Sequence, residues 1–315
     1  MDHQPNQLAH QLFEKAIADR EALGIQFESV SGARVLDFAV GRAGCLDAGV
    51  LLGKICMGGL AQIVVSDGDD SLGLRSVEVC TDEPLLACIG SQYAGWPISC
   101  GDYFAMGSGP FRLLRGEEDV LSAYRLSATR QQAVGVLESN QLPSNATLEQ
   151  MAAECGIENS LLNVCVARTA SWPGAVQVVA RSVEVAMHKL NELQFDLSTI
   201  RSAVGKAPLP PLAGDDMTAL GWTNDAILYG GRVELVVDAA DEAVSSVVER
   251  LPSSSSPEFG APFLDIFERY NKDFYKIDKM LFSPASVRIE NQATGTVWDV
   301  GEIRHDILKR SYGME

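Results

Sequence analysis

Residues 171–194, SWPGAVQVVARSVEVAMHKLNELQ, combine an apolar repeat with a line of polar side chains. At 100° per residue, one side of a helix over 175–193 collects apolar residues and the other side collects polar ones. The apolar set is Val179, Val183, Ala186, Leu190 and Leu193. The polar set is Arg181, Glu184 and His188, at spacings of three and four. We therefore predict one helix over 175–193 with a polar stripe opposite its core-facing side.

The pair Arg181 and Glu184 within this stripe has two interpretations. A cation and a carboxylate three residues apart on a helix can touch. At the mouth of a cleft, such an arginine can hold a glutamate ionised and oriented as a general base. Taken alone, however, a polar stripe is more often an ordinary solvated helix face.

Composition restricts the class of protein. The chain has 315 residues, 46% of them hydrophobic, and can bury a large core as one large domain or as two closely joined ones. Its net charge of −17 argues against nucleic acid and anionic membranes as partners, because both require a basic patch. We therefore expect a small-molecule ligand.

The N-terminus and the cysteines indicate the compartment. Leu8, Leu12, Ala16 and Ile17 give residues 6–22 the pattern of an amphipathic helix rather than of an export signal, and no apolar run is long enough to span a bilayer. The seven cysteines form no CxxC pair, so we expect no zinc site and reduced, buried thiols in a cytoplasmic protein. They are Cys45, Cys56, Cys80, Cys88, Cys100, Cys155 and Cys165. A nucleophilic cysteine is the alternative, although no histidine is an obvious partner.

Periodicity predicts a mixed protein of the α+β class. Strands are expected at 34–40, 61–66, 75–81, 132–138, 163–168, 232–238, 285–291 and 295–300. Helices are expected near 6–22, 45–58, 146–155, 175–193, 240–250 and 261–270. Their irregular alternation favours mixed sheets over a regular βαβ winding.

Three short motifs have more than one interpretation. The GSG of YFAMGSGP (103–110) lacks the spacing of a dinucleotide or phosphate loop, and it predicts either a tight turn or a backbone wall against a ligand. In GWTNDAILYGG (221–231), Thr223, Asn224 and Asp225 either cap a helix or face a ligand. SDGDDSLG (66–73) lacks the last ligand of a calcium loop and predicts a hairpin.

Seven segments in the same order resemble one family, methenyltetrahydromethanopterin cyclohydrolase, of the kind that bacteria use in formaldehyde oxidation. The segments are DAGVLLGKICMGGLAQ (47–62), SQYAGWPIS (91–99), YFAMGSGPFRLL (103–114), LESNQLP (137–143), ARSVEVAMHKLNE (180–192), GWTNDAILYGG (221–231) and FYKIDKMLFSPASV (274–287). The resemblance implies a hydrolase of one-carbon metabolism that converts 5,10-methenyltetrahydromethanopterin to the 5-formyl compound. It also implies a homotrimer and two associated domains, 1–125 and 126–315, with the pterin in the cleft between them. The C-terminal strands could return to the first domain.

The resemblance assigns roles to particular residues. The family's catalytic pair falls on Glu184, which activates water, and Arg181, which assists it. Because the methenyl bridge is already an amidinium-like electrophile, no metal or permanently bound cofactor is needed, and tetrahydromethanopterin enters as the substrate. The expected substrate-binding residues are Ser91, Gln92, Tyr93, Met106, Gly107, Ser108, Gly109, Asn140, Gln141, Thr223, Asn224 and Asp225.

Tyr93 departs from the family pattern. Archaeal members read SQKAGW where this chain reads SQYAGW, so Tyr93 replaces a lysine that could meet an anionic substrate tail. Arg42, Lys54 or Arg112 could supply that charge instead. Two other functions stay open at this point, a non-catalytic pterin-binding paralogue and a cysteine-dependent amidohydrolase. Retention of both Arg181 and Glu184 speaks against the paralogue.

Overall fold

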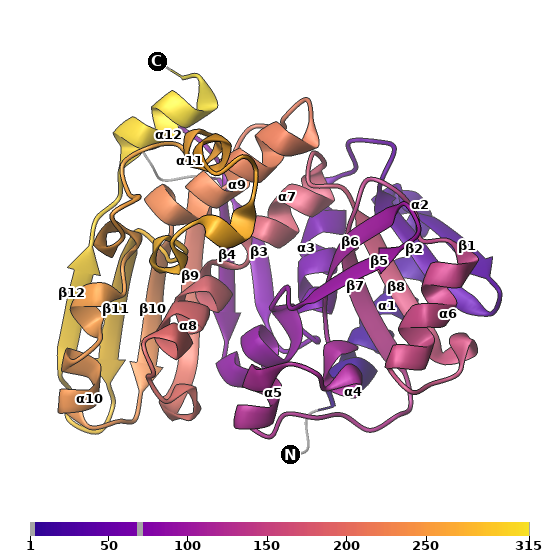
Figure 1. The fold of residues 1–315 in the computed structure, drawn as a ribbon, viewed down its shortest axis with the longest axis horizontal. Coiled ribbons are helices and arrows are strands. Elements are labelled where there is room, and N and C mark those ends of the chain that lie inside the picture. Colours follow the sequence, from indigo (N-terminus) through magenta and orange to yellow (C-terminus); the bar gives the residue numbers. More distant parts are fainter. Residues whose placement is uncertain (1–3, 68–71, 315) are drawn as a thin grey trace. The chain divides into compact units, whose positions relative to one another are not determined.

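The computed structural model describes residues 4–67 and 72–314 and separates the chain into two compact units (Figure 1). Unit 1 comprises Met1–Ala61 and Leu86–Gln177, and unit 2 comprises Gln62–Leu85 and Val178–Glu315. Each unit contains one six-stranded mixed sheet together with helices. The α+β class is therefore confirmed.

The sheet of unit 1 has parallel strands at its centre and antiparallel strands towards its edges. Its order is β1 (Gln26–Val30), β2 (Ala33–Ala39), β8 (Leu162–Ala167), β7 (Ala133–Glu138), β6 (Tyr103–Ser108) and β5 (Trp96–Cys100). The pairs β2–β8 and β8–β7 are parallel, and the other three are antiparallel. Strand β8 is buried at every residue, as expected for a central strand with both faces covered.

Helices cover both faces of this sheet. The longer ones in unit 1 are α1 (Pro5–Ala18), α3 (Leu46–Cys56) and α6 (Asn145–Glu154), and the short ones are α2 (Arg20–Leu23), α4 (Arg112–Arg115), α5 (Asp119–Ala123) and η2 (Asn159–Leu161). Helices α1 and α3 pack with Leu36, Phe38 and Val136 on one face. Helix α6 packs with Val164 and Leu137 on the other. The hydrophobic core of unit 1 therefore has two layers.

The sheet of unit 2 is covered on one face and open on the other. Its order is β12 (Val297–Gly301), β11 (Ser286–Asn291), β10 (Arg232–Val237), β9 (Ile200–Pro208), β4 (Ser76–Thr81) and β3 (Gln62–Ser66), and only β10–β11 is parallel. Buried and exposed residues alternate along β10, as they do along any strand with one solvated face. Val64 and Val204 are 55% and 44% exposed on their strands.

The helices of unit 2 are α8 (Ser182–Glu192), α9 (Asp216–Gly230), α10 (Asp241–Ser245), α11 (Phe263–Arg269) and α12 (His305–Tyr312), with short 3-10 turns η3 (Leu197–Thr199), η4 (Val248–Arg250), η5 (Ser253–Ser255), η6 (Phe274–Lys276) and η7 (Lys279–Leu281). Helices α8 and α9 contact β9, and α9 also contacts α11 and α12. Tyr229, Phe263 and Leu308 belong to the apolar cluster that joins α9, α11 and α12. Among the described residues, no helix is both long and apolar enough to cross a bilayer.

The structure differs from the helices and strands expected from sequence in one divided helix and in several elements that were not predicted. The single helix predicted over 175–193 is wrong: the chain forms α7 (Trp172–Val179) and α8, separated by a turn at Ala180 and Arg181. Strands β1, β5, β6 and β9, helices α9 and α12, and the π-helix η1 (Leu85–Gln92) were not predicted. The expected hairpin is confirmed by the antiparallel pair β3–β4, although its residues 68–71 lie outside the described part.

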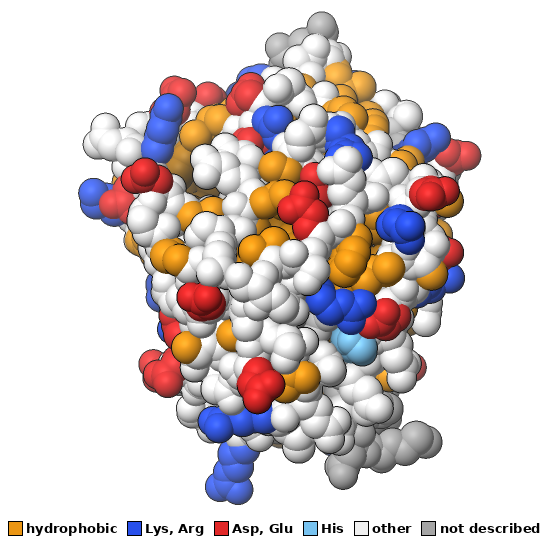
Figure 2. All heavy atoms as spheres, turned by 90° about the vertical axis from the view of Figure 1, so that its right-hand side faces the viewer, with side chains coloured by type: hydrophobic (Ala, Val, Ile, Leu, Met, Phe, Trp, Pro, Cys, Tyr) orange, Lys and Arg blue, Asp and Glu red, His pale blue; other side chains and the backbone are white. Residues whose placement is uncertain are grey.

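Charged side chains are mixed on the surface. Figure 2 shows one face of the molecule, on which Lys and Arg side chains lie among Asp and Glu rather than in one patch. A nucleic-acid backbone requires a contiguous basic surface. This face does not offer one.

Candidate active site

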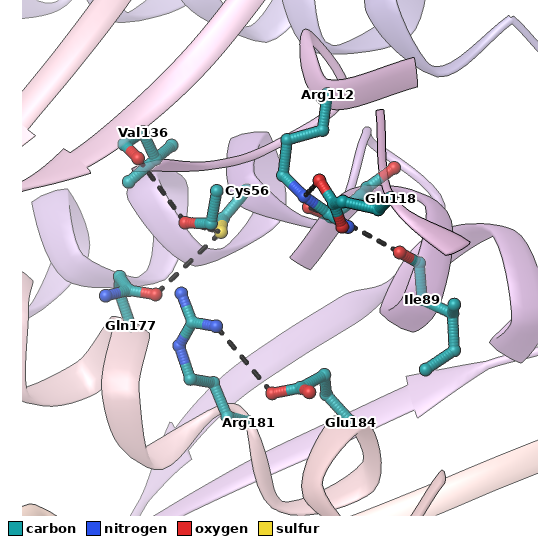
Figure 3. Close-up of polar contacts among 10 residues, drawn as sticks. Cys56, Ile89, Arg112, Glu118, Val136, Gln177, Arg181 and Glu184 are labelled. Atoms are coloured by element: carbon teal, nitrogen blue, oxygen red, sulfur yellow. Dashed lines mark hydrogen bonds and ion pairs between the residues drawn. The ribbon is translucent and has the colours of Figure 1, made fainter. Parts of the chain in front are cut away.

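Arg181 and Glu184 lie at the start of α8. The turn after α7 places Arg181 directly before the helix, and Glu184 is in its first turn. Arg181 Nη1 lies 3.7 Å from Glu184 Oε2, and the two side chains are only 9% and 7% exposed (Figure 3). The solvated-face interpretation is therefore wrong for this pair, because both charges are buried.

The position on the helix favours an ionised Glu184. The first turn of a helix presents backbone N–H groups and a positive dipole end, which stabilise a carboxylate. The separation of 3.7 Å is within ion-pair range but longer than a direct hydrogen bond. At this distance the guanidinium and the carboxylate form an ion pair. His188, the third member of the predicted stripe, pairs with Glu192 instead, at 3.9 Å.

The Ser91 and Gly109 segments meet inside unit 1. The π-helix η1 ends at Gln92, and π-helical turns are frequent at functional sites. Gly109 N donates to Ser91 O over 2.7 Å, directly after β6. The φ of Gly109 is +103°, which side chains rarely adopt, and the chain turns there. Gly107 and Ser108 still belong to strand β6, so the tight-turn interpretation of GSG is correct only for Gly109. Whether a ligand also meets this turn stays a prediction.

Most of the remaining unit 1 candidates line the β6–β7 pair. Gly107 and Ser108 pair with Leu137 and Val136, and Met106 pairs with Glu138. Ser108 Oγ also lies 3.3 Å from the buried Cys56 thiol. Asn140 and Gln141 are exposed and follow β7 near Phe104, at the opposite end of β6 from Gly109, so the structure does not group them with Ser91.

Tyr93 contacts a buried ion pair that sequence reasoning missed. Arg112 is fully buried, and its Nε donates to Glu118 Oε1 over 2.9 Å while Nη2 contacts the other carboxylate oxygen (Figure 3). Its Nη1 donates to Ile89 O and Ser91 O, both over 3.1 Å, and its guanidinium lies 5.1 Å from the Tyr93 ring centroid.

Arg112 thus binds carbonyl groups at the end of the π-helix, which a helix end leaves without backbone partners. Four of the five N–H groups of Arg112 contact Glu118, Ile89 and Ser91, and the side chain is fully buried, so Arg112 does not fit the role of a free cation for a substrate tail. A spacing of six residues between Arg112 and Glu118 has no helical period, so no sequence pattern signals this pair.

The unit 2 candidates Thr223, Asn224 and Asp225 do not cap the helix that contains them. They lie in the middle of α9, whose N-cap is Asp215. The Thr223 hydroxyl and the Asn224 amide donate to carbonyl groups one turn earlier on the helix. The predicted capping role is therefore wrong for Thr223 and Asn224, whereas Asp225 accepts from the free N–H of Phe263 in the first turn of another helix, α11.

Asp225 connects three helices. Its carboxylate accepts a hydrogen bond of 2.8 Å from Phe263 N at the start of α11 and one of 2.6 Å from Ser311 Oγ in α12. Burial raises the pKa of Asp225 to about 7, against the effect of these two donors. These two contacts attach α9 to α11 and α12.

Lys189, in α8, is a second buried charge that the sequence did not signal. Its Nζ donates to Pro252 O and Ser255 Oγ, both over 2.8 Å, and to Met280 O over 2.5 Å. Burial lowers the pKa of Lys189 to about 7. Three acceptors match the three N–H groups of an ammonium, so Lys189 attaches the Glu184 helix to the loops around η5 and η7.

The cysteines are free thiols, and four of the seven are buried: Cys56, Cys88, Cys155 and Cys165. The expectation that all are buried is wrong, since Cys80 is exposed and Cys45 and Cys100 are partly exposed. Within residues 4–67 and 72–314, no three His, Cys, Asp or Glu side chains form a group suited to a metal.

Comparison with known proteins gives the class. The family model described as Cyclohydrolase (MCH) matches residues 5–312. Since this match covers almost the whole sequence, the chain belongs to the methenyltetrahydromethanopterin cyclohydrolase family, and it is a hydrolase.

Individual relatives are similar to this chain along most of their length. The methenyltetrahydromethanopterin cyclohydrolase of Rhodopirellula baltica is 50% identical over 293 residues, which cover 91% of this chain and 88% of that protein. The protein of the same name from Methanospirillum hungatei is 39% identical over 98% of both chains. That from Methylobacillus flagellatus is 38% identical over 98% of this chain and 95% of its own.

Proposed function

We propose that this chain hydrolyses 5,10-methenyltetrahydromethanopterin to 5-formyltetrahydromethanopterin, reversibly, with Glu184 as the general base and Arg181 assisting. The buried Arg181–Glu184 pair carries this proposal, because two charges with side chains less than 10% exposed are costly to bury unless they are paired or used. The names of the relatives support the substrate.

The reaction requires one base and no change of redox state. Water adds its oxygen to the methenyl carbon while Glu184 accepts one of its protons. The resulting hydroxyl group becomes the formyl carbonyl as the bond from carbon to N10 breaks, and N10 takes the proton held by Glu184. The second water proton is released, which balances the positive charge of the amidinium substrate.

Arg181 contributes through its charge. At 3.7 Å it favours the ionised form of Glu184. Glu184 is therefore ionised when the substrate arrives. Tetrahydromethanopterin serves as the C1 carrier, and we propose no permanently bound cofactor.

We further infer that the enzyme is a cytoplasmic homotrimer acting in one-carbon metabolism, in formaldehyde oxidation. For substrate binding we propose the residues predicted from the sequence. They are Ser91, Gln92, Tyr93, Met106, Gly107, Ser108, Gly109, Asn140, Gln141, Thr223, Asn224 and Asp225. Ser91, Gln92 and Tyr93 are the strongest candidates because they lie at the end of the π-helix. Tyr93→Ala should raise KM more than it lowers kcat, since a stacking or packing contact serves ground and transition states alike.

The proposal is tested by adding the purified protein to the methenyl compound. We expect loss of the methenyl absorbance band, formation of the 5-formyl product and release of one proton per turnover. Formation of a different product, or binding without turnover, would contradict the proposal. Sedimentation of the same preparation at three chain masses would support the trimer.

A further inference from the structure

Unit 2 contains a cavity of about 200 Å³ at one end of its sheet. Its polar lining comes from Ser76 of β4, Lys206 of β9, Arg232 of β10 and His305 of α12. Pro208 and Leu308 contribute apolar walls. Within the part of the chain that the structure describes, no Asp or Glu lines this cavity, although the whole chain carries 42 Asp and Glu against 25 Lys and Arg.

The two strongest cations of this cavity are forced together by strand register. Lys206 and Arg232 are direct partners in the antiparallel pair β9–β10, and like charges in that position destabilise a sheet. Glu78, the partner of Lys206 on β4, offsets one charge through a hydrogen bond of 2.7 Å. Lys206 in turn lowers the pKa of Glu78, so this carboxylate is ionised and already used.

Arg232 differs from its neighbours on the sheet. Within the described residues, no carboxylate oxygen lies within the 4.0 Å ion-pair limit of its guanidinium. By contrast, Arg288 pairs with Asp299 at 2.8 Å, and Arg201 pairs with Asp238 at 3.3 Å. A guanidinium fork beside an acid-free cavity is suited to a ligand with paired oxygen atoms.

We propose that this cavity binds a small dianion of the phosphate type, either inorganic phosphate or a terminal phosphate group. Arg232 supplies the fork and the charge that no carboxylate offsets, Lys206 supplies N–H donors beside its partner Glu78, and Ser76 and His305 supply polar groups at the rim. The cavity is smaller than the pockets that enclose whole drug-sized ligands, so it fits an anionic group rather than a pterin ring. The anion neutralises the opposed pair Lys206 and Arg232.

Calorimetric titration with inorganic phosphate, at constant ionic strength set with chloride, tests this site without any assay of turnover. The wild-type protein should bind phosphate saturably. Arg232→Gln should weaken binding by about 10- to 100-fold, the worth of charge-assisted hydrogen bonds. Arg288→Gln is the matched control, since it removes a paired arginine from the same sheet, and it should bind like the wild type.

Absence of saturable phosphate binding in the wild type, or equal losses in Arg232→Gln and Arg288→Gln, would overturn the site. Two further arms distinguish the source of the anion once binding is established. If the cavity takes an anionic group of the substrate, phosphate raises KM in the wild type and not in Arg232→Gln. If it takes free phosphate, KM is unchanged. Failure of the proposed hydrolase activity would leave the titration result intact.

Discussion

Glu184 combines two properties that are seldom found together on a helix, burial and a charged partner at only ion-pair distance. The sequence predicted the contact with Arg181, because a spacing of three on a helix brings side chains together. It could not predict the burial, because this depends on how α8 packs after the turn at Ala180 and Arg181. Periodicity carries no information on such packing, and the continuous helix expected there is wrong.

Arg181→Lys should not behave as a conservative change. A lysine ammonium is a point charge on a flexible stem and cannot reproduce the planar guanidinium beside Glu184. We expect lower kcat for Arg181→Lys, because the planar donors are lost. Arg181→Ala should lose more kcat and should also shift the acidic limb of the rate profile to higher pH, because only this variant removes the positive neighbour of the ionised base.

Measuring kcat and KM across pH for both variants checks this role of Arg181. Arg201→Lys is the control, since its arginine forms an exposed pair with Asp238, and its profile should match the wild type. An effect of the Arg181 variants on KM alone, with an unmoved acidic limb, would show uniform substrate binding instead.

The π-helix η1 depends on Arg112 for its ending. Replacing this residue by Gln leaves Glu118, whose side chain is only 12% exposed, without its cation and removes the donors to Ile89 and Ser91. Because a broken buried pair typically costs about 3–5 kcal/mol, Arg112→Gln should lower the free energy of unfolding by that amount.

Arg115→Gln is a matched control on the same helix, α4. Arg115 pairs with Glu154 over 3.0 Å and lies 4.8 Å from the Trp96 ring centroid while remaining 22% exposed, so its loss should cost about 1–2 kcal/mol, less than the loss of Arg112. Urea unfolding of both variants measures the difference. Equal destabilisation of the two variants would mean that burial of the Arg112–Glu118 pair does not increase its contribution to the free energy of unfolding.

Asp225 should make helix packing in unit 2 sensitive to pH. Its folded pKa of about 7 lies above its ordinary value of 3.8, so the folded state binds the extra proton between these values. The stability from this group is complete below pH 3.8 and is lost as pH rises through about 7, at up to about 1.4 kcal/mol per pH unit.

Asp225→Asn keeps an acceptor for Phe263 N and cannot titrate. The unfolding free energy of this variant relative to the wild type should therefore rise between pH 4 and pH 7. Chemical unfolding of both proteins at several pH values measures it. Parallel curves for the two proteins would refute the assignment of a raised pKa to Asp225.

Eight strands were predictable because they are short β-branched runs between turn residues, and all eight are present. Strand β9 was missed because IRSAVGKAP mixes Gly, Ala and Lys, and its strand form comes from pairing on both sides with β4 and β10. Helix α9 was missed because Gly221 and Thr223 lower its propensity, and packing against α11 and α12 overrides that. Partners distant in sequence decided both elements.

For the molecule as a whole, the proposed reaction uses neither a thiol nor a metal. All seven cysteines are free, and Cys80 is the one that is exposed. Alkylating the accessible thiols of the folded protein should therefore leave most of the activity, and metal chelators should leave it unchanged. Activity and thiol counts are measured on the same sample. Complete inactivation that substrate prevents would contradict this and favour a cysteine nucleophile.

The most direct measurement is the rate of loss of the methenyl absorbance band with wild-type protein, Glu184→Gln and Glu192→Gln. Glu192 lies on the same helix and is 28% exposed, so it controls for changes to α8 itself. We predict normal folding for all three proteins, near wild-type turnover for Glu192→Gln, and a loss of about 10² to 10⁴ in kcat for Glu184→Gln. Near wild-type hydrolysis by a correctly folded Glu184→Gln protein would contradict the assignment of Glu184 as the base.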